Sequence, residues 1–340
     1  MSELLITISL LLVKLGLIFA VVLSLAAYMV LAERKILGRM QLRHGPNRVG
    51  PGGMLQPLAD VIKLLTKEDL VPAKADRIMF LVAPGMASLT ALLSFAVVPF
   101  SPPVTLFGRE IPMVVCDLNI GLLYFLGLSS LAVYGIALGG WASNSKYALF
   151  GSIRGLAQLI SYELSMGLAV VPVVLSAKSF SLTDIVVSQG DWPNLLRHPV
   201  AFLIFMISVM AESKRTPFDL PEGENEIVAG YHTEYSGMKF AFFYMAEYAH
   251  MVLVSSLVVI LFFGGWLPPF PSVKALAFLH VVPGFVWYLV KIMFFLYLYV
   301  WIRATFPRYR FDSLIRLVWK WLIPLSLLNF LIVALVRFLL

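Results

Sequence analysis

The segment from residue 211 to residue 240 concentrates side chains that carry charge and can exchange protons. It reads AESKRTPFDLPEGENEIVAGYHTEYSGMKF and sets six carboxylates against the three bases Lys214, Arg215 and Lys239. The six acids are Glu212, Asp219, Glu222, Glu224, Glu226 and Glu234. If residues 222–226 are extended, alternate side chains point the same way, which places the middle three glutamates on one side. Close carboxylates repel, so some would hold protons near neutral pH. A solvated acidic loop is the competing interpretation.

Further acids fall inside or beside stretches that are otherwise apolar. Glu163 lies within 156–177, Glu247 lies within 240–263, Glu212 ends the stretch 199–211, and Asp117 precedes 118–140. One ionised carboxylate at the centre of a membrane helix costs about 2.5–3.5 kcal/mol. Two or three would cost about 5–10 kcal/mol, comparable to the stability of a whole domain. We therefore expect these acids to be protonated, paired or in contact with water. A proton relay and structural hydrogen bonding between helices both remain open.

A second unusual segment covers residues 32–77. Its middle, HGPNRVGPGG at 44–53, has turn chemistry but lacks the spacing and the Lys-Ser/Thr pair of a phosphate-binding loop. Residues 54–67 are predicted to be helical, with one apolar stripe formed by Leu55, Leu58, Ile62 and Leu65 and with Asp60 off that stripe. This pattern is typical of an interfacial amphipathic helix. A lip on a cavity that opens to the bilayer is the alternative.

The whole composition indicates a membrane protein. Of the 340 residues, 60% are hydrophobic and 13% charged, whereas soluble domains are about 45–50% apolar and about 25% charged. Eight stretches approach the roughly 20 apolar residues that a spanning helix needs. They lie near 4–31, 79–100, 118–140, 156–177, 199–211, 240–263, 277–301 and 319–340. The fifth is short, so we expect it to continue into its flanks. The sequence predicts a single all-α polytopic membrane domain over 1–340.

Basic residues are distributed unequally between alternate loops. Loops 33–77, 141–154, 212–239 and 302–320 together hold nineteen Lys and Arg, and the intervening loops hold four. The positive-inside rule therefore predicts that the four basic loops are cytoplasmic and that both termini lie outside. Glu33 and Arg34 would then sit where the first span leaves the membrane, a common place for an anchoring charged pair.

Residue types that bind redox cofactors are sparse. Cys116 is the single cysteine, and the five histidines include no pair within the predicted spans that suits a haem. No CxxC, GxGxxG or zinc spacing is present. We expect this chain to bind no metal and no redox cofactor of its own.

Four segments together resemble a known family. They are ERKILGRMQLRHGPNRVGPGGMLQPLADVIKLLTKE, GWASNSKYALFGSIRGLAQLISYELSMGLA, AESKRTPFDLPEGENEIVAGYHTEYSG and WIRATFPRYRFD. They are similar to the H subunit of the proton-translocating NADH:quinone oxidoreductases, the bacterial respiratory complex I, whose mitochondrial counterpart is the first membrane-encoded subunit. The resemblance covers essentially the whole chain.

The resemblance implies a role in quinone reduction and in its coupling to proton translocation. It implies a bacterial inner-membrane location, with partner subunits of the hydrophilic arm and the membrane arm, and with flavin and iron–sulfur clusters held by partners. The quinone-chamber residues it implies are Glu33, Arg34, Arg43, Asp60, Arg215 and Tyr244. The acidic path it implies comprises Asp117, Glu163, Glu212, Asp219, Glu222, Glu224, Glu226, Glu234 and Glu247.

Two other functions fit part of the same pattern. A stand-alone proton-coupled transporter would also carry intramembrane acids, but we find no internal repeat in the sequence. The related component of a membrane-bound hydrogenase complex is the second alternative, and the FDLPEGENE and HGPNRVGPGG strings favour the quinone enzyme over it. Nothing in the chain indicates nucleic-acid binding.

Overall fold

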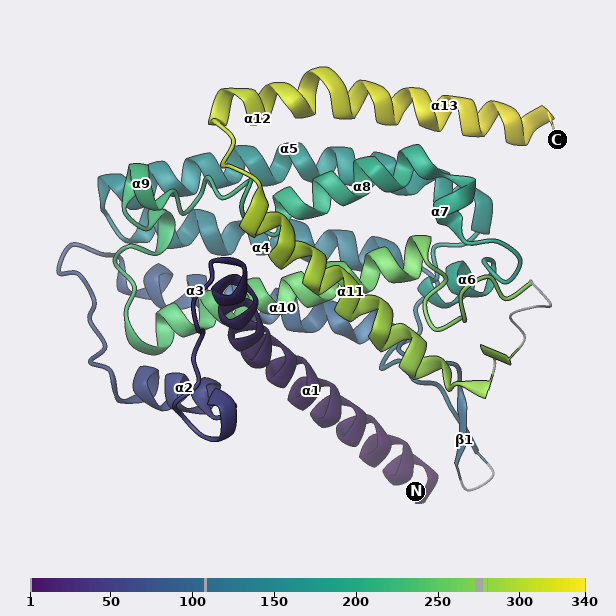
Figure 1. The fold of residues 1–340 in the computed structure, drawn as a ribbon, viewed down its shortest axis with the longest axis horizontal. Coiled ribbons are helices and arrows are strands. Elements are labelled where there is room, and N and C mark those ends of the chain that lie inside the picture. Colours follow the sequence, from purple (N-terminus) through teal and green to yellow (C-terminus); the bar gives the residue numbers. More distant parts are fainter. Residues whose placement is uncertain (1, 107–108, 273–277, 280, 340) are drawn as a thin grey trace.

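Long helices dominate the computed structural model, which describes residues 2–106, 109–272, 278–279 and 281–339 (Figure 1). Within these described residues, seven helices are long and apolar enough to cross a membrane, which confirms the predicted all-α polytopic class. The long helices are α1 (Ser2–Met40), α3 (Arg77–Ser94), α4 (Gly121–Ala142), α5 (Lys146–Ala177), α10 (Gly237–Phe262), α11 (Gly284–Thr305) and α13 (Ile323–Leu339), which continues α12 (Phe311–Leu317) through the π-helical turn η5 (Val318–Leu322).

Shorter elements connect the long helices. On one side of the bundle they are η1 (Pro51–Gly53), α2 (Gln56–Thr66), α9 (Glu224–Ile227) and η3 (Gly230–His232). At the opposite side they are η2 (Phe95–Val97), α6 (Leu182–Val187), α7 (Asn194–Arg197) and an antiparallel hairpin of β1 (Val104–Leu106) and β2 (Arg109–Ile111), in which Val104 pairs with Ile111. The expected helix at 54–67 is confirmed as α2.

The fifth predicted span corresponds to α8 (Pro199–Glu212), which is apolar but shorter than the seven long helices. Its 14 residues extend about 21 Å, less than the roughly 30 Å of a hydrocarbon core. The expectation that it continues into its flanks is wrong. Pro199 fixes its start, and Lys214, two residues beyond its end, adopts a left-handed backbone with φ 53°. In Figure 1 the start of α1 and the end of α13 both lie toward the side of the bundle that carries the hairpin.

Connections expected to share one side of the membrane meet at one end of the bundle. The basic end consists of residues 41–76, 143–145, 213–236 and 306–310, joined for example by the backbone bonds Asp76 N to Ala142 O and Tyr309 N to Pro217 O. The hairpin end consists of residues 95–106, 109–120, 178–198 and 263–272, and it is joined for example by the backbone bond from Leu122 N to Phe180 O. Two helices reach further into the basic end than expected. Because α1 ends at Met40 and α5 begins at Lys146, much of the predicted loops is helical.

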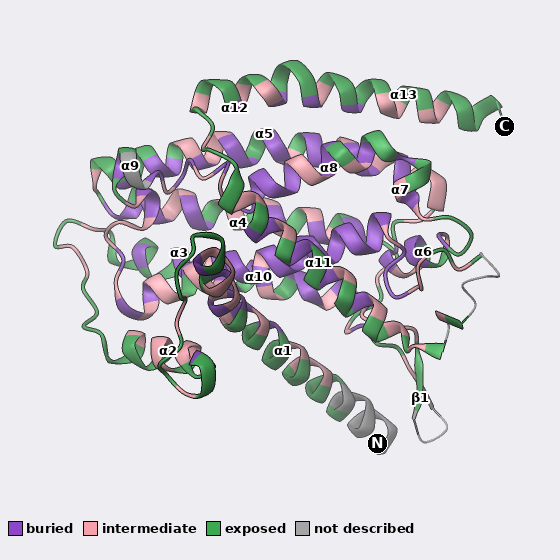
Figure 2. Ribbon diagram, viewed as in Figure 1, coloured by how far each residue is buried: buried purple, intermediate pink, exposed green. Residues whose placement is uncertain are grey.

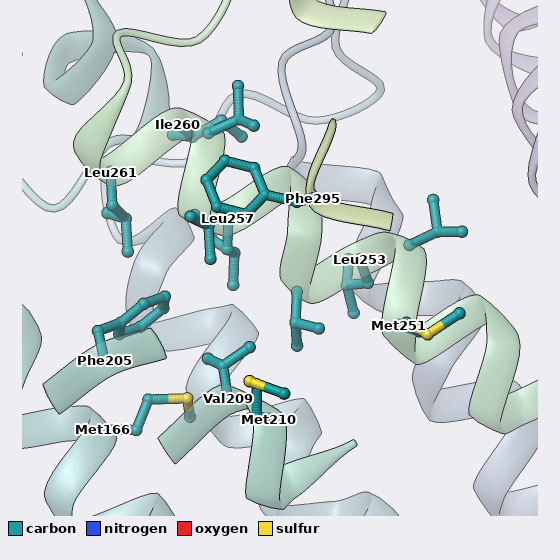
Figure 3. Packing of buried hydrophobic residues seen from close by; sticks show 14 of the residues in the cluster. Met166, Phe205, Val209, Met210, Met251, Leu253, Leu257, Ile260, Leu261 and Phe295 are labelled. Atoms are coloured by element: carbon teal, nitrogen blue, oxygen red, sulfur yellow. The ribbon is translucent and has the colours of Figure 1, made fainter. Parts of the chain in front are cut away.

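The core is built around α10, which is buried along almost its whole length (Figure 2). Leu253, Leu257 and Leu261 of α10 pack with Met166 of α5 and Phe205 of α8 (Figure 3). A helix that is hydrophobic all round belongs at the centre of a bundle, and α10 fits that rule. By contrast, α1 and α13 are mostly exposed, and their outward residues are apolar, as a membrane environment requires.

Three side chains from elsewhere in the chain bind carbonyl groups in the last turn of α10 and in the segment that follows it. Gln189 Nε2 donates to Ile260 O at 2.8 Å, and Asn194 Nδ2 donates to Leu261 O at 2.9 Å. The ammonium group of Lys291, on α11, donates to the carbonyls of residues 263, 265 and 267 at 2.7, 3.0 and 2.7 Å. Carbonyls left without partners at a helix end are thus satisfied by an opposing positive charge and two amides.

The exposed thiol of Cys116 gives a direct test of sidedness. Cys116 lies at the hairpin end, which the basic bias predicts to be outside. A membrane-impermeant maleimide should therefore label the wild-type chain in sealed right-side-out vesicles, and Cys116→Ser should abolish the labelling. Moving the thiol to the fully exposed Leu42 at the basic end, as Leu42→Cys in the Cys116→Ser background, should give labelling only after the vesicles are opened. The reverse pattern would overturn the orientation.

Candidate functional site

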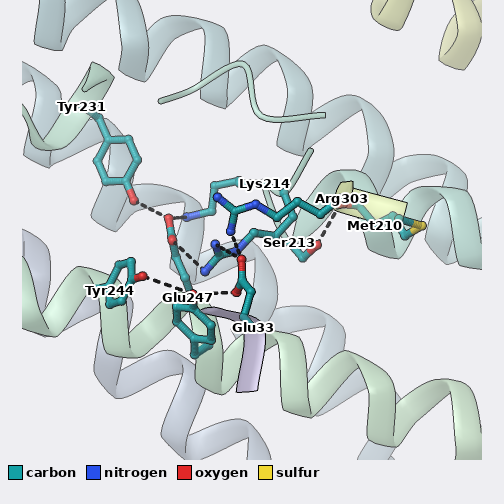
Figure 4. Close-up of polar contacts among 10 residues, drawn as sticks. Glu33, Met210, Ser213, Lys214, Tyr231, Tyr244, Glu247 and Arg303 are labelled. Carbon is teal, nitrogen blue, oxygen red and sulfur yellow. Dashed lines mark hydrogen bonds and ion pairs between the residues drawn. The ribbon is translucent and has the colours of Figure 1, made fainter. Parts of the chain in front are cut away.

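A buried carboxylate near the end of α1 accepts bonds from two other helices. Glu33 is 4% exposed. Tyr248 of α10 donates its hydroxyl proton to Glu33 Oε2 at 2.7 Å, and Arg303 of α11 donates to Glu33 Oε1. Arg215, from the segment after α8, places Nη1 3.8 Å from the same oxygen. Three segments distant in sequence therefore converge on the carboxylate that α1 carries (Figure 4).

A second buried carboxylate, Glu247 of α10, lies on the other side of Arg215. Arg215 Nη2 is 3.7 Å from Glu247 Oε2, and Lys214 Nζ is 3.5 Å from Glu247 Oε1. Tyr231 donates its hydroxyl proton to Glu247 Oε1 at 2.9 Å. Because its guanidinium faces both Glu33 and Glu247, Arg215 electrostatically links the two acids. We call Glu33, Lys214, Arg215, Glu247 and Arg303 the charged cluster (Figure 4).

Two loop acids adjoin the charged cluster, and burial raises the pKa of both. Burial raises the pKa of Glu222 well above its ordinary value, and the nearby carboxylates of Glu247 and Asp219 raise it further. Burial also raises the pKa of Asp219 to about 6, although Arg308 opposes this by donating to Asp219 Oδ2 at 2.8 Å. The loop thus places Glu222, whose raised pKa favours the protonated form, next to the buried Glu247, which is paired with Lys214 and Arg215.

The backbone of the acidic loop explains this placement. Gly223 is left-handed, with φ 43° and ψ 48°, and α9 follows at once, so residues 222–226 are not extended and the condition for three glutamates on one side is not met. Glu222 turns inward, whereas Glu226 is exposed and pairs with Arg154 at 2.5 Å. Gly230 lets the loop close on itself, because a Cβ there would meet the Pro221 carbonyl oxygen at 1.7 Å.

A small internal cavity of about 40 Å³ gathers the acids of the helices. Glu163 of α5, Glu212 of α8 and Glu247 of α10 line it together with Lys214 and His250. His250 Nε2 lies 3.6 Å from Glu212 Oε1, and Ser130 of α4 donates to Glu163. A cavity of this size and polarity has room for water between these side chains. The arrangement can pass protons between carboxylates that do not touch one another.

A much larger cavity of about 490 Å³ lies between α1, α2 and α10. Its walls are mainly apolar, and its polar residues include Arg34, Asp60, Tyr244 and Tyr248. Arg34 Nη1 donates to Asp60 Oδ2 at 3.0 Å, and the hydroxyl groups of Tyr244 and Tyr248 are 3.1 Å apart. Tyr248 in turn bonds Glu33, so the wall of the large cavity is in direct contact with the charged cluster.

The predicted apolar stripe of α2 does not form the wall of this cavity. Leu55, Leu58, Ile62 and Leu65 are between 48% and 61% exposed and face outward, while Val61 and Leu64 line the cavity. The outward stripe suits a membrane surface, and the adjacent face of the same helix covers the cavity. The two interpretations of this helix, interfacial helix and cavity lip, therefore describe different faces of it.

Comparison with known proteins identifies the family. The sequence matches the NADH dehydrogenase family over residues 13–334. The chain is 59% identical to the H subunit of the NADH-quinone oxidoreductase of Syntrophotalea carbinolica over 98% of both chains. It is 48% identical to an H subunit of the same enzyme from Rhizobium meliloti, over 97% of this chain and 98% of the relative. The chain belongs to this family. The resemblance drawn from its motifs is thereby confirmed.

Several site residues expected from the family resemblance lie outside the two cavities and the charged cluster. Arg43 is exposed and bonds the nearby Gln41. Asp117 is exposed at the hairpin end, where Thr183 donates to it at 3.3 Å. Glu226 is on the surface and Glu234 is half-buried, and the side chain of Glu224 lies outside the described residues. Among the residues that the structure describes, no group of three His, Cys, Asp or Glu is arranged to hold a metal.

Other residues of the site were not among those that the resemblance implied. They are Lys214, Tyr231, Tyr248, His250 and Arg303. Lys214 and Tyr231 fall within the AESKRTPFDLPEGENEIVAGYHTEYSG segment, and Arg303 falls within WIRATFPRYRFD. Their position in these segments did not indicate their contacts, because only the fold brings Lys214 and Tyr231 to Glu247.

Proposed function

We propose that this chain is the membrane subunit of a proton-pumping NADH:quinone oxidoreductase that forms much of the quinone chamber and couples quinone reduction to proton translocation. The observation that carries the proposal is the contact between the large cavity and the charged cluster through Tyr248. Tyr248 forms part of the wall of the large cavity and is hydrogen-bonded to the buried carboxylate of Glu33. A ligand in this cavity would therefore lie next to the charged cluster.

The large cavity suits a quinone with a prenyl tail. Its volume of about 490 Å³ falls within the roughly 300–1,000 Å³ of small-molecule sites. The apolar walls from α1 and α10 favour the tail, and the outward apolar face of α2 favours a position at the membrane surface, from which a lipid-soluble substrate can enter. Arg34, Asp60 and Tyr244 supply the polar contacts, and Glu33 and Arg215 lie behind them.

The charged cluster and the small cavity suit the coupling step. At an effective dielectric constant of about 20, a unit charge 4 Å away is worth about 4 kcal/mol, or about three pKa units. Negative charge that develops on a reduced quinone therefore shifts protons among Glu33, Glu222 and Glu247. The small cavity continues from Glu247 to Glu212 and Glu163. Because Glu163 is only half-buried between α4 and α5, we infer that the path leaves the chain there.

The setting of this function follows from the family. We infer that the chain assembles with the hydrophilic-arm subunits that complete the quinone site and with other membrane-arm subunits. The basic end faces the cytoplasm of a bacterial inner membrane, where the hydrophilic arm docks. The flavin and iron–sulfur clusters reside in partners, and quinone is the substrate. Family membership favours this assignment over the stand-alone transporter, and the names of its relatives favour it over a component of a hydrogenase.

Two neighbouring leucines of α2 provide a matched test of the chamber. Leu64 lines the large cavity, whereas Leu65 is 60% exposed on the other face. Leu64→Trp fills cavity volume and should raise the KM for quinone about tenfold or weaken a quinone-site inhibitor comparably, because overpacked sites cost about 1–3 kcal/mol. Leu65→Trp should leave both unchanged. NADH oxidation by a soluble artificial acceptor should survive in both enzymes.

Equal kinetics for the two variants would show that the large cavity does not receive quinone. Loss of both activities together with loss of assembly in Leu64→Trp would assign this residue to folding alone, and Arg34→Ala with Arg39→Ala as its control would then decide. Both arginines lie near the end of α1, but only Arg34 lines the cavity. An Arg34→Ala enzyme with unaltered quinone kinetics would reject the chamber.

A further inference from the structure

A histidine of α10, His250, lines the small cavity together with the helix acids. It follows Glu247 by three residues, about 4.5 Å along the helix axis, so the two side chains share one face of α10. The side chain of His250 is 14% exposed, so the bundle largely encloses it. The family resemblance implied no role for His250, and the path proposed above consists of carboxyl groups and water alone.

One ring nitrogen of His250 faces Glu212 of α8. His250 Nε2 lies 3.6 Å from Glu212 Oε1, about half an ångström beyond a normal hydrogen bond. The same nitrogen is buried and has no hydrogen-bond partner among the described residues. Buried polar groups are rarely left without a partner. A small rotation of either side chain brings the imidazole into bonding contact with the carboxyl group of Glu212.

Groups of both charges surround the imidazole. Glu163, Glu212, Glu247 and Lys214 line the same cavity, and Lys214 Nζ is 3.5 Å from Glu247 Oε1. Like charges repel, so an imidazolium beside the charged Lys214 gives up its proton readily to a neighbouring carboxylate. A neutral imidazole has one nitrogen that donates and one that accepts. His250 can therefore receive a proton from one neighbour and give one to another.

The carboxyl groups of Glu247 and Glu212 have different neighbours. Tyr231 and Lys214 contact Glu247. Ser129 of α4 bonds the carboxyl group of Glu212, and His250 is its other close polar neighbour among the described residues. The second oxygen of Glu212, Oε2, has no hydrogen-bond partner among them. A proton that moves from Glu247 to Glu212 therefore needs an intermediate group, and His250 lies on the face of α10 that carries Glu247.

We propose that His250 carries protons between Glu247 and Glu212, an inference that rests on the proton path proposed above. The neutral imidazole takes up a proton that leaves Glu247 by way of water in the small cavity, and it becomes an imidazolium. It then gives a proton from Nε2 to Glu212 Oε1. The ring is neutral again, Glu247 is ionised and Glu212 is protonated. Lys214 stabilises the ionised Glu247 and repels the imidazolium, so the proton moves on to Glu212.

An amide at position 250 tests this role. Glutamine can donate and accept hydrogen bonds, as the imidazole does, but it cannot take up a proton. His250→Gln in the assembled enzyme, reconstituted in vesicles, should lower proton uptake and coupled quinone reduction about tenfold. A positioned proton carrier contributes about 10²–10⁴-fold, and water in the cavity replaces part of that contribution. NADH oxidation by a soluble artificial acceptor should be retained. Quinone reduction by this variant should also slow more in heavy water than that by the wild type, because proton transfer becomes rate-limiting.

Two matched variants separate proton transfer from structure. His250→Glu has the shape of His250→Gln but can hold a proton, so it should recover part of the lost proton uptake. His198→Gln makes the amide change at a buried histidine of the hairpin end, where Nε2 lies 2.7 Å from Ser176 Oγ, and it should leave proton uptake unchanged. Equal losses in His250→Gln and His250→Glu would make His250 a structural residue and overturn the proposal.

A comparison with Glu212→Gln distinguishes the role of His250 from the path as a whole. Normal proton uptake by His250→Gln, beside a loss in Glu212→Gln, would overturn the role of His250 and leave the path to water and carboxyl groups. Normal uptake in both variants would overturn the path itself, and His250 with it. If His250→Gln does not assemble, the smaller amide of His250→Asn takes its place, with His250→Asp as the variant that can hold a proton.

Discussion

Replacing Arg215 with methionine should lower quinone reduction by about a hundredfold while NADH oxidation by a soluble artificial acceptor continues. Arg215 lies between the buried acids Glu33 and Glu247, at 3.8 and 3.7 Å. Its guanidinium also stacks on the Tyr248 ring, with Cζ 4.3 Å from the ring centroid. Removing one partner of a buried ion pair costs about 3–5 kcal/mol, because the other charges remain buried. The substitution should therefore disturb both the chamber wall and the first acids of the path.

Two further variants distinguish an effect specific to Arg215 from the general effect of removing an arginine. Arg310→Met removes an arginine that is 84% exposed and pairs only with Asp312 among the described residues, so it should leave both activities near wild type. Arg215→Lys keeps the positive charge but cannot face two carboxylates with separate nitrogens, and it should recover part of the lost activity. If Arg215→Met reduces quinone at the normal rate in assembled enzyme, the charged cluster has no part in the reaction.

Proton pumping should fail when the three helix acids lose their ability to titrate. Glu163, Glu212 and Glu247 share the small cavity, and a glutamine at each position keeps the shape but cannot carry a proton. The triple Glu→Gln enzyme, reconstituted in vesicles, should show at least a tenfold loss of coupled quinone reduction and of proton uptake measured with a pH-sensitive dye. Artificial-acceptor activity should be retained.

The single variant Glu163→Gln is the control for a folding defect in the triple variant. Glu163 accepts a hydrogen bond from the Ser130 hydroxyl, which a glutamine can also accept, whereas Glu247 neutralises buried cations. We expect a smaller loss of pumping in this variant than in the triple. Asp117→Asn changes an exposed acid at the hairpin end and should pump normally, which would remove Asp117 from the path. Normal pumping by the triple variant would mean that these acids are tolerated polar groups and not a relay.

Much of the fold was predictable because the signals are local. Apolar runs and the alternation of basic loops locate the crossings, and the stripe of α2 locates its helix. The failures also have local causes. The apolar run 199–211 matches α8 to within one residue, and the error was to extend it because a span needs about 20 residues. The turn at Gly223 has no periodic signal, since it depends on the backbone of a single residue. The apolar run does not predict that α1 continues as a helix to Met40, because the last turns of this helix are polar.

The site was predictable only as a set of acids and bases, without the contacts between them. Glu33 was expected in the chamber, but its hydrogen-bond partners Tyr248 and Arg303 lie 215 and 270 positions along the chain. Composition indicates that buried carboxylates need compensation but does not say which cation supplies it. Asp117, Arg43 and Glu226 have the right chemistry, yet the fold places them at the surface.

The bonds from Gln189, Asn194 and Lys291 to the C-terminal carbonyls of α10 have a mechanical consequence. They fasten that end of the helix to three other parts of the bundle, whereas the opposite end carries Tyr244, Tyr248 and Glu247 between the two cavities. Glu247 lies about 20 Å from the fastened end at 1.5 Å per residue. If α10 pivots about that end as a rigid rod, a tilt of about 3° displaces Glu247 by about 1 Å. Because Tyr244 and Tyr248 lie on the same helix, such a tilt would move them together with Glu247.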